Sequence, residues 1–376
     1  MAKKGKDGDA RSGGMGARAR DIFTISNLAR LPSNLATVRK FINVMNWKAA
    51  QEEIAQELGH RVAILGMANS GKSTLFNTLR GAHTSPVSPE EGTTKTLVRG
   101  QFGPFALIDT PGHLPDLQND AIEEAAAIVY LLDASQGIRP GDVAAVTKLR
   151  NDDKPLVVAL NKSDMLRDSA DEAAAEAAAR LHISDVIPIS GKTGENIGQE
   201  LIPAIIETSP EAALALGRVL PQYRRDAADR IVRHATLFNL VAGMEPIPLI
   251  DIPVLLSTQI RMVFRVAALY NEPLGSRPTR ELIVTIAGGL FFRYLAEEAA
   301  KAVPFGGDLV SGAIAGAGTW ALGHVAIEYF EGGKQLTAAQ LRELFARFYR
   351  RYREENPEAG RTSVTAARDV VVAGEG

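Results

Sequence analysis

The sequence predicts an α/β domain built on a mostly parallel sheet, preceded by an N-terminal helical arm and followed by an all-helical C-terminal domain. In the middle of the chain, short β-branched segments alternate with helical stretches, an order typical of a parallel sheet with helices on both faces. Before it, apolar residues recur at helical spacing and end at Gly59, and after it the patterns are helical. With 376 residues, the chain is long enough for two domains with separate cores.

The predicted division of the chain has five parts. Residues 1–20 are expected to form a disordered tail, 21–59 the helical arm, 60–209 the α/β domain, 210–356 the helical domain and 357–376 a second tail. No apolar run follows the basic residues at the N-terminus, so they do not read as a secretory signal. The expected strands are Arg61–Leu65, Leu97–Phe102, Phe105–Asp109, Ile128–Asp133, Leu156–Asn161 and Val186–Ser190.

Composition narrows the function classes. The net charge is −2 and 45% of the residues are hydrophobic, so no global basic excess indicates a nucleic acid, and DNA is not expected as a partner. The chain has no cysteine, which excludes a disulfide framework and a thiolate metal site. These features are consistent with a reducing cytoplasm.

A glycine-rich segment predicts a phosphate-binding loop (P-loop). The residues Gly66-Met67-Ala68-Asn69-Ser70-Gly71-Lys72-Ser73 follow an apolar strand and precede a helix, which is the context that such a loop requires. Backbone N–H groups of the loop would cradle phosphates at the helix N-terminus. Lys72 would reach the β- and γ-phosphates, and the Ser73 hydroxyl would ligate Mg²⁺. The nucleotide-binding residues expected here are Asn69, Ser70, Gly71, Lys72, Ser73 and Thr74.

Three further motifs follow in order, each at the end of an expected strand. In Asp109-Thr110-Pro111-Gly112, the aspartate would hold Mg²⁺ through water and the Gly112 N–H would sense the γ-phosphate. In Asn161-Lys162-Ser163-Asp164, the Asp164 carboxylate can accept hydrogen bonds from guanine N1–H and the N2 amine, which adenine does not offer. Asn161 and Lys162 would brace the loop and cover the base. In Ser190-Gly191-Lys192, a backbone N–H can meet guanine O6.

With these motifs in place, residues 61–208 resemble the Era/TrmE-type GTPase family of the translation-factor class. The resemblance implies that the chain binds GTP with Mg²⁺ and hydrolyses it to GDP and phosphate. It also implies a Mg²⁺-binding threonine in the first switch loop, where this chain reads Gly92-Thr93-Thr94-Lys95. Thr94 is the better match and Thr93 the second choice, and the alternative is an exposed threonine-rich loop without this role.

Two positions bear on the mechanism. Asn69 stands where K⁺-activated members of this group carry an asparagine, so its side-chain oxygen would help to hold K⁺ against the phosphates; alternatively, it only shapes the loop. His113 follows the Asp-Thr-Pro-Gly motif, where translation-factor GTPases carry histidine and relatives of Era carry an apolar residue. It would orient the attacking water, or it points outward and catalysis relies on a cation, dimerisation or a partner. The expected catalytic residues are Lys72, Thr94 and His113.

Residues 225–330 resemble a helical domain of unknown activity that follows Era-like GTPase modules in some bacterial proteins. The resemblance rests on Asn239–Pro253 and on a glycine-rich segment beyond it, and it implies association with a membrane. Ser311–Ile327 carries no Asp, Glu, Lys or Arg, but its length is at the short edge of the roughly 20 residues that span a bilayer. Peripheral or partial insertion, a spanning helix and a soluble helical core all remain open.

Leu341–Arg353 predicts a basic amphipathic helix with Leu341, Leu344, Phe345, Phe348 and Tyr352 on one face. Such a helix can lie on anionic lipid, or it can pack its apolar face on the domain and leave its arginines in solvent.

The sequence therefore predicts a GTPase switch, activated by Mg²⁺ and K⁺, whose helical domain responds at a membrane or protein surface. We expect it in the cytoplasm, peripheral on the inner face of the cell membrane. The expected partners are GTP, a membrane surface and a second copy bound through the GTPase domain. The alternatives are a cytoplasmic GTPase that associates with a ribosome or RNA, the less favoured partners, and a nucleotide-gated scaffold with negligible turnover.

Overall fold

The computed structural model describes residues 47–82, 98–108, 120–242, 251–283 and 308–356. Its α/β domain is a six-stranded sheet with the strand order β2-β3-β1-β4-β5-β6. Strand β2 runs antiparallel to β3, and the other neighbouring strands pair in parallel, which confirms the predicted mostly parallel sheet. The strands are β1 (Arg61–Gly66), β2 (Val98–Phe102), β3 (Phe105–Ile108), β4 (Ala125–Asp133), β5 (Leu156–Asn161) and β6 (Ile187–Ile189).

Helices cover both faces of this sheet, because successive residues of each strand point to opposite sides. One face packs against α7 (Pro140–Asn151) and α8 (Ala170–Leu181). The other packs against α5 (Lys72–Ala82), α9 (Ile202–Thr208) and α10 (Pro210–Val219). A short helix, α6 (Asp120–Glu123), precedes β4.

The chain leaves the α/β domain at Ser209, between α9 and α10. The Ser209 side chain accepts a hydrogen bond from the Ala212 N–H and so caps α10, a common device at helix starts. The same hydroxyl donates to the carbonyl of Ala126 at the start of β4, over a distance of 2.9 Å. Helix α10 is thereby fixed to the amino-terminal end of the sheet, and its apolar side chains share one buried cluster with both domains.

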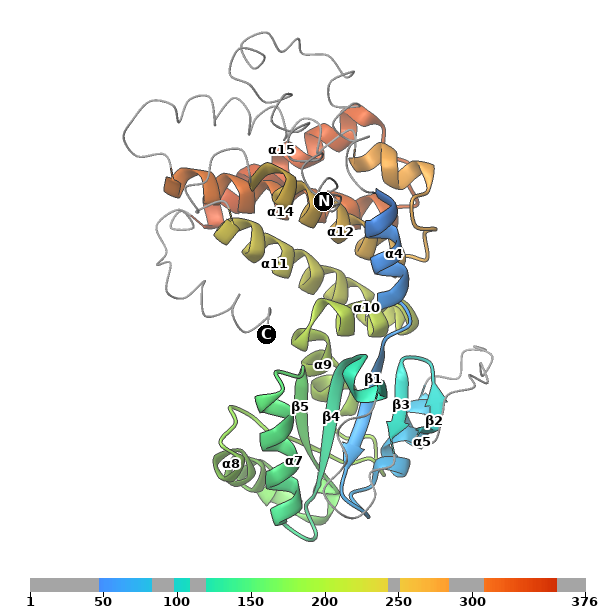
Figure 1. The fold of residues 1–376 in the computed structure, drawn as a ribbon, viewed down its shortest axis with the longest axis vertical. Helices are drawn as coiled ribbons and strands as arrows, with labels where there is room; N and C mark the ends of the chain where they lie inside the picture. The colour runs from blue at the N-terminus through green and yellow to red at the C-terminus, as the bar shows by residue number, and fades with distance from the viewer. Residues whose placement is uncertain (1–46, 83–97, 109–119, 243–250, 284–307, 357–376) are drawn as a thin grey trace, which may run out of the picture.

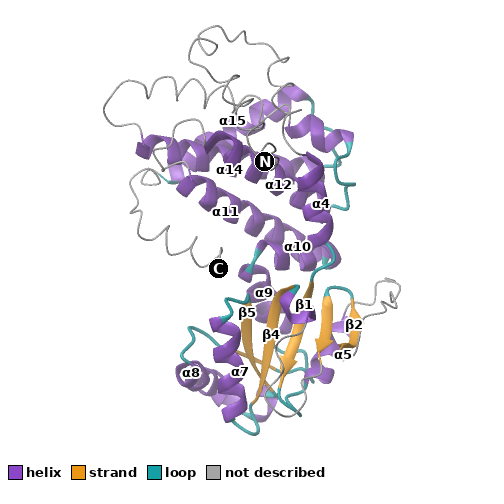
Figure 2. Ribbon diagram, viewed as in Figure 1, coloured by secondary structure: helices purple, strands orange, loops and turns teal. Residues whose placement is uncertain are grey.

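The helical domain contains α11 (Arg224–Ala242), α12 (Asp251–Leu269), α14 (Asp308–Glu331) and α15 (Ala338–Glu355). Helix α14 packs closely on α11: a Cβ added to Gly316 would lie 3.2 Å from Leu240 Cβ, and one added to Gly323 would lie 2.4 Å from a methyl of Val232. Figure 1 shows this domain above the sheet, with α10 and α4 (Trp47–Glu57) near the junction. In Figure 2, the orange strands all lie in the α/β part, where purple helices flank them, and the part above it is drawn as helices and loops.

Helix α4 is the described end of the predicted N-terminal arm, and it packs against the helical domain. The Arg265 guanidinium on α12 pairs with Glu57 of α4 at 2.7 Å and with Glu211 of α10 at 2.9 Å. Arg261, one turn earlier on α12, pairs with Glu53 at 2.7 Å. Because β1 begins only a few residues after α4, these ion pairs hold the segment that leads into the sheet.

Helices α14 and α15 include the two segments for which the sequence left the membrane question open. Among the residues that the structure describes, none of the helices is both long and apolar enough to cross a membrane. The apolar face of α15 packs on α14, with Leu341, Leu344 and Tyr349 buried, so the described helix turns its arginines rather than its apolar face outward.

Candidate nucleotide-binding site

The predicted P-loop lies at the carboxyl end of β1 and leads directly into α5. Three of its residues have positive φ: Gly66 at 145°, Asn69 at 65° and Gly71 at 89°. Two of them have no room for a side chain. A Cβ at Gly71 would stand 2.2 Å from Asn161 Nδ2, and one at Gly66 would stand 2.5 Å from the Leu131 carbonyl oxygen. The glycine spacing therefore permits a tight loop whose backbone turns at the helix N-terminus.

Lys72 closes this loop from its helical end. Its Nζ atom donates to the carbonyl oxygens of Gly66 at 2.7 Å and Met67 at 3.0 Å. The ammonium group thus lies within the curve of the loop, where a phosphate group bound by the N–H groups would meet it. Ser73 and Thr74 follow in the first turn of α5 and are exposed.

Asn161, at the end of β5, ties two loops together. Its Nδ2 donates to the Ser70 carbonyl of the P-loop, and its Oδ1 accepts from the Gly191 N–H after β6, both at 2.8 Å. Asn161 is 2% exposed, so these bonds are protected from water. The amide therefore fixes the P-loop relative to the loop expected to meet guanine O6.

The residues expected to read the base are held by neighbouring side chains. Ser190 Oγ donates to Asp164 Oδ1 at 2.7 Å and accepts from the Thr193 N–H at 3.1 Å. Lys162 takes a left-handed backbone conformation, with φ at 70°, and its Nζ lies 2.7 Å from Asp133 Oδ2. Lys192 is exposed at the rim of the same loop.

Asp133, at the end of β4, is a site residue that the sequence analysis missed. It is fully buried and accepts hydrogen bonds from Lys162, Ser135 and Gln136. Burial alone would raise the pKa of Asp133, but hydrogen bonds from Lys162 and Ser135 outweigh it and hold that pKa below its usual range. The signal that could have identified it is an aspartate at the end of an apolar strand, the position at which Asp109 and Asn161 were selected.

Two further residues, far from their partners in the sequence, donate hydrogen bonds to the loops of the site. Arg139, at the start of α7, donates from Nη1 to the Ala68 carbonyl of the P-loop at 3.2 Å. Thr78 on α5 donates from Oγ1 to the Gly191 carbonyl. Neither belongs to a motif, so no sequence pattern indicated them.

Thr93, Thr94, Asp109, Gly112 and His113 lie outside the described residues, and their assigned roles stay predictions. Among the described residues, no cluster of three or more His, Asp or Glu side chains is able to hold a metal ion. Of the predicted Mg²⁺ ligands, Ser73 lies among the described residues, and its hydroxyl is exposed in the first turn of α5, where Mg²⁺ bound mainly by a nucleotide's phosphates and by water would need one protein oxygen. The arrangement can bind an anionic nucleotide and present a carboxylate to its base.

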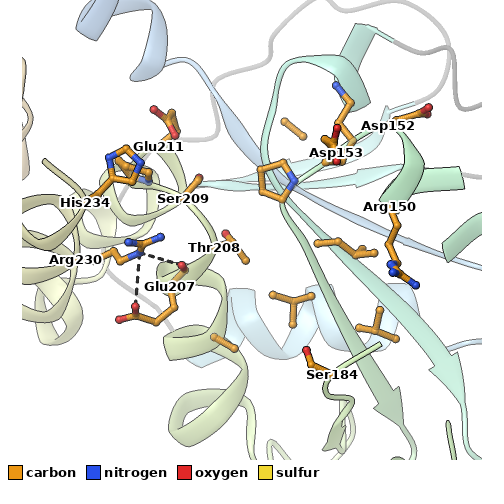
Figure 3. Close-up of a pocket in the computed structure, with 18 of the residues that line it drawn as sticks. Arg150, Asp152, Asp153, Ser184, Glu207, Thr208, Ser209, Glu211, Arg230 and His234 are labelled. Atoms are coloured by element: carbon orange, nitrogen blue, oxygen red, sulfur yellow. Dashed lines mark hydrogen bonds and ion pairs between the residues drawn. The ribbon is translucent and has the colours of Figure 1, made fainter. Parts of the chain in front are cut away.

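A hollow lies at the end of the sheet opposite the P-loop, between the two domains (Figure 3). It has a volume of about 1460 Å³ and is lined by residues of both domains. Figure 3 places Glu207, Arg230 and His234 on one side and Asp152 and Asp153 on the other. Arg230 and Glu207 are ion-paired across 3.6 Å, and charges of both signs line the hollow, so no single ligand chemistry is indicated.

Comparison with known proteins agrees with this geometry. Residues 61–162 match a family model described as 50S ribosome-binding GTPase, and residues 212–354 match a domain of unknown function, DUF697. The two matches confirm both resemblances drawn from the sequence.

Curated relatives match part of the chain. GTPase Der of Gemmatimonas aurantiaca is 36% identical over 40% of this chain and 37% of its own length. GTPase Der of Syntrophotalea carbinolica is 33% identical over 49% of this chain and 45% of its own length. GTPase Era of Aquifex aeolicus is 30% identical over 40% of this chain and 56% of its own length. The chain thus spans about half, or less, of the relatives that it matches.

Proposed function

We propose that this chain, which joins an Era-like GTPase domain to a DUF697 helical domain, binds GTP with Mg²⁺ and hydrolyses it to GDP and phosphate as a molecular switch. The observation that carries the proposal is the pair of 2.8 Å hydrogen bonds by which Asn161 joins the P-loop to the loop after β6. One amide thereby aligns the phosphate site with the base site, as a single nucleotide requires.

Each predicted site residue has a task in this proposal. Lys72 and the N–H groups of the P-loop bind the phosphates, and Lys72 stabilises the charge that develops during phosphoryl transfer. Asp164 selects guanine, because its carboxylate accepts from both N1–H and the N2 amine. Ser73 would hold Mg²⁺, which neutralises phosphate charge. Thr94 would be a second Mg²⁺ ligand, Asp109 would hold Mg²⁺ through water, and His113 would orient the attacking water.

Potassium activation belongs to the same proposal. The Asn69 backbone takes a left-handed conformation, with φ at 65°, and this conformation sets the direction in which the side chain leaves the loop. Its amide oxygen would help to hold K⁺ beside the phosphates. Steady-state phosphate release in K⁺ and in Na⁺ tests this: we expect faster turnover in K⁺ for the native chain and equal rates for Asn69→Ala. Equal rates in the native chain would remove K⁺ from the proposal.

The helical domain is proposed to respond to the nucleotide at an anionic membrane surface, with the protein cytoplasmic and peripheral on the inner face of the cell membrane. What supports this is the outward face of α15, where five arginines are exposed: Arg342, Arg347, Arg350, Arg351 and Arg353. Exposed Glu343, Glu354 and Glu355 lie on the same helix, so its net charge is modestly positive. Basic side chains near an anionic surface each contribute about 1 kcal/mol.

Flotation with anionic vesicles tests the membrane part. We expect the full chain to float with phosphatidylserine vesicles but not with phosphatidylcholine vesicles, and to do so differently with GDP and a non-hydrolysable GTP analogue. Arg347→Gln/Arg350→Gln should weaken flotation, whereas the matched pair Arg80→Gln/Arg180→Gln, exposed on the GTPase domain, should not. If the native chain stays at the bottom of the gradient with both vesicles, the membrane part is wrong.

A ribosome is the alternative partner, favoured by the description of the matching family model as a 50S ribosome-binding GTPase. Salt-sensitive cosedimentation with 50S subunits, together with failure to float, would support this alternative.

Self-association through the GTPase domain is also proposed and is tested by sedimentation velocity with GDP and with the GTP analogue. Tight GTP binding without turnover in K⁺ would instead indicate a nucleotide-gated scaffold.

A further inference from the structure

We propose that Arg139 is a positioning residue of the nucleotide site, which holds the P-loop by its Ala68 carbonyl and thereby fixes Asn69. Arg139 Nη1 donates to the Ala68 oxygen at 3.2 Å, from a position 71 residues away in sequence. The next residue of the loop, Asn69, has a φ of 65°, a conformation that costs a non-glycine residue energy unless its surroundings hold it. The proposal rests on the nucleotide-binding function proposed above.

The guanidinium is itself held firmly. Arg139 Nε donates to Asp142 Oδ2 at 3.1 Å, and the Arg139 backbone N–H donates to the same oxygen at 2.9 Å. The other oxygen of Asp142 accepts from the Tyr130 hydroxyl at 3.0 Å. Asp142 is fully buried and Tyr130, in the central strand β4, is 1% exposed. The arginine is therefore anchored through Asp142 to a buried side chain of β4, and holding its contact with the P-loop costs little side-chain entropy.

The same loop of the chain also contacts the base-reading motif. Gln136 Oε1 accepts from Arg139 Nη1 at 3.3 Å, and Gln136 Nε2 donates to Asp133 Oδ2 at 3.1 Å. That carboxylate oxygen also accepts from Lys162 at 2.7 Å. A continuous hydrogen-bonded path thus runs from Lys162 to Ala68, so the segment between β4 and α7 supports the base end and the phosphate end together.

Because of this arrangement, loss of Arg139 should affect kcat and KM for GTP to different extents. Nucleotide binding depends on Lys72 and on the N–H groups of the P-loop, which Arg139 does not touch. Catalysis depends on the placement of Asn69 and of any cation that it holds, and a misplacement of about 1 Å can cost on the order of a hundredfold in rate. Loss of Arg139 should thus lower kcat much more than it raises KM for GTP.

The test compares Arg139→Met with a matched control, Arg150→Met. Arg150 lies near the end of the same helix and also donates from Nη1 to a distant backbone carbonyl, that of His182, at 2.7 Å. We expect Arg139→Met to lower kcat about tenfold or more, with KM and GDP affinity within about threefold of the native chain. Arg150→Met should match the native chain. Arg139→Lys, which keeps the charge and a donor, should recover most of the lost rate.

Two outcomes would overturn the proposal. In one, Arg139→Met turns over GTP as fast as Arg150→Met. In the other, kcat, GDP affinity and the melting temperature all fall together and Arg139→Lys restores none of them, which would indicate a purely structural arginine. The native chain, measured alongside with fluorescent GDP and by phosphate release, tells these results apart from failure of the proposed function: a native chain that neither binds nor hydrolyses nucleotide removes both.

Discussion

Replacing Asn161 by alanine removes the one side chain that joins the P-loop to the loop after β6. Two hydrogen bonds of 2.8 Å disappear, and the Ser70 carbonyl and the Gly191 N–H are left without that partner in a buried place. An unsatisfied buried polar group costs about 1–3 kcal/mol, and two such groups are left, so we expect the free energy of unfolding to fall by about 2–6 kcal/mol.

The same change should weaken nucleotide binding, because the two loops would no longer be aligned before the nucleotide arrives. A loss of 1.4 kcal/mol in preorganisation corresponds to about tenfold in Kd. Urea unfolding without nucleotide and titration with fluorescent GDP measure the two effects separately. Asn77→Ala, an exposed asparagine on α5, is the matched control and should change stability by less than about 1 kcal/mol. The reasoning is refuted if Asn161→Ala unfolds and binds GDP like this control.

Three further predictions follow from the same structure. Gly71→Ala should abolish GDP binding in a titration while GDP still binds the native chain, because its Cβ would stand 2.2 Å from the Asn161 amide; unchanged affinity would contradict the loop geometry. Asp164→Asn should shift turnover from GTP toward xanthosine triphosphate, since an amide cannot accept from both base donors, and retained GTP selectivity would contradict the base-reading role. Burial lowers the pKa of His234 and of His324, so the unfolded chain binds protons more tightly and stability should fall as the pH drops below the ordinary histidine pKa of about 6.5. Urea unfolding at pH 7.5 and 5.5 should show this loss, and His234→Gln should reduce it; an equal loss in that variant would exclude His234 as the cause.

The sheet was predictable because its strands are β-branched runs that end in polar motifs. β5 begins and ends where the pattern places it, at Leu156 and Asn161. β4 begins at Ala125 rather than at the expected Ile128, because its first three residues are alanines, which carry little strand propensity, although Ala125 and Ala127 pair with β1 on either side of a register shift. The expected strand end at Asp109 lies outside the described residues, and β3 is described to Ile108.

The residues that brace the site were harder to predict than the residues that form its motifs. Asp133 faces Asn161 in the register of β4 and β5, and this pairing brings it to Lys162. Strand order and register are properties of the folded sheet, so no local pattern contains them. Arg139 was missed for the same reason, since its contact with Ala68 depends on how the N-terminus of α7 sits beside β1. The motif residues, in contrast, carry spacings that the chemistry of phosphate and guanine demands.

In the helical domain, the amphipathic pattern predicted an apolar helix face but not what that face packs against. The apolar face expected at Leu341–Arg353 exists, but its partner was ambiguous between lipid and protein. In the structure α15 packs that face on α14, where Phe348 meets Trp320 at a ring separation of 5.7 Å. Periodicity reports that a face is apolar and does not report what covers it.

The measurement that tests the central claim most directly is phosphate release from GTP by the full chain in K⁺ and Mg²⁺, together with GDP binding, for the native protein and for Lys72→Ala. We expect GDP binding and measurable turnover in the native chain, with both lost in the variant, because Lys72 lies inside the curve of the P-loop. Turnover that persists unchanged in Lys72→Ala would contradict the assignment of the P-loop as the GTP site.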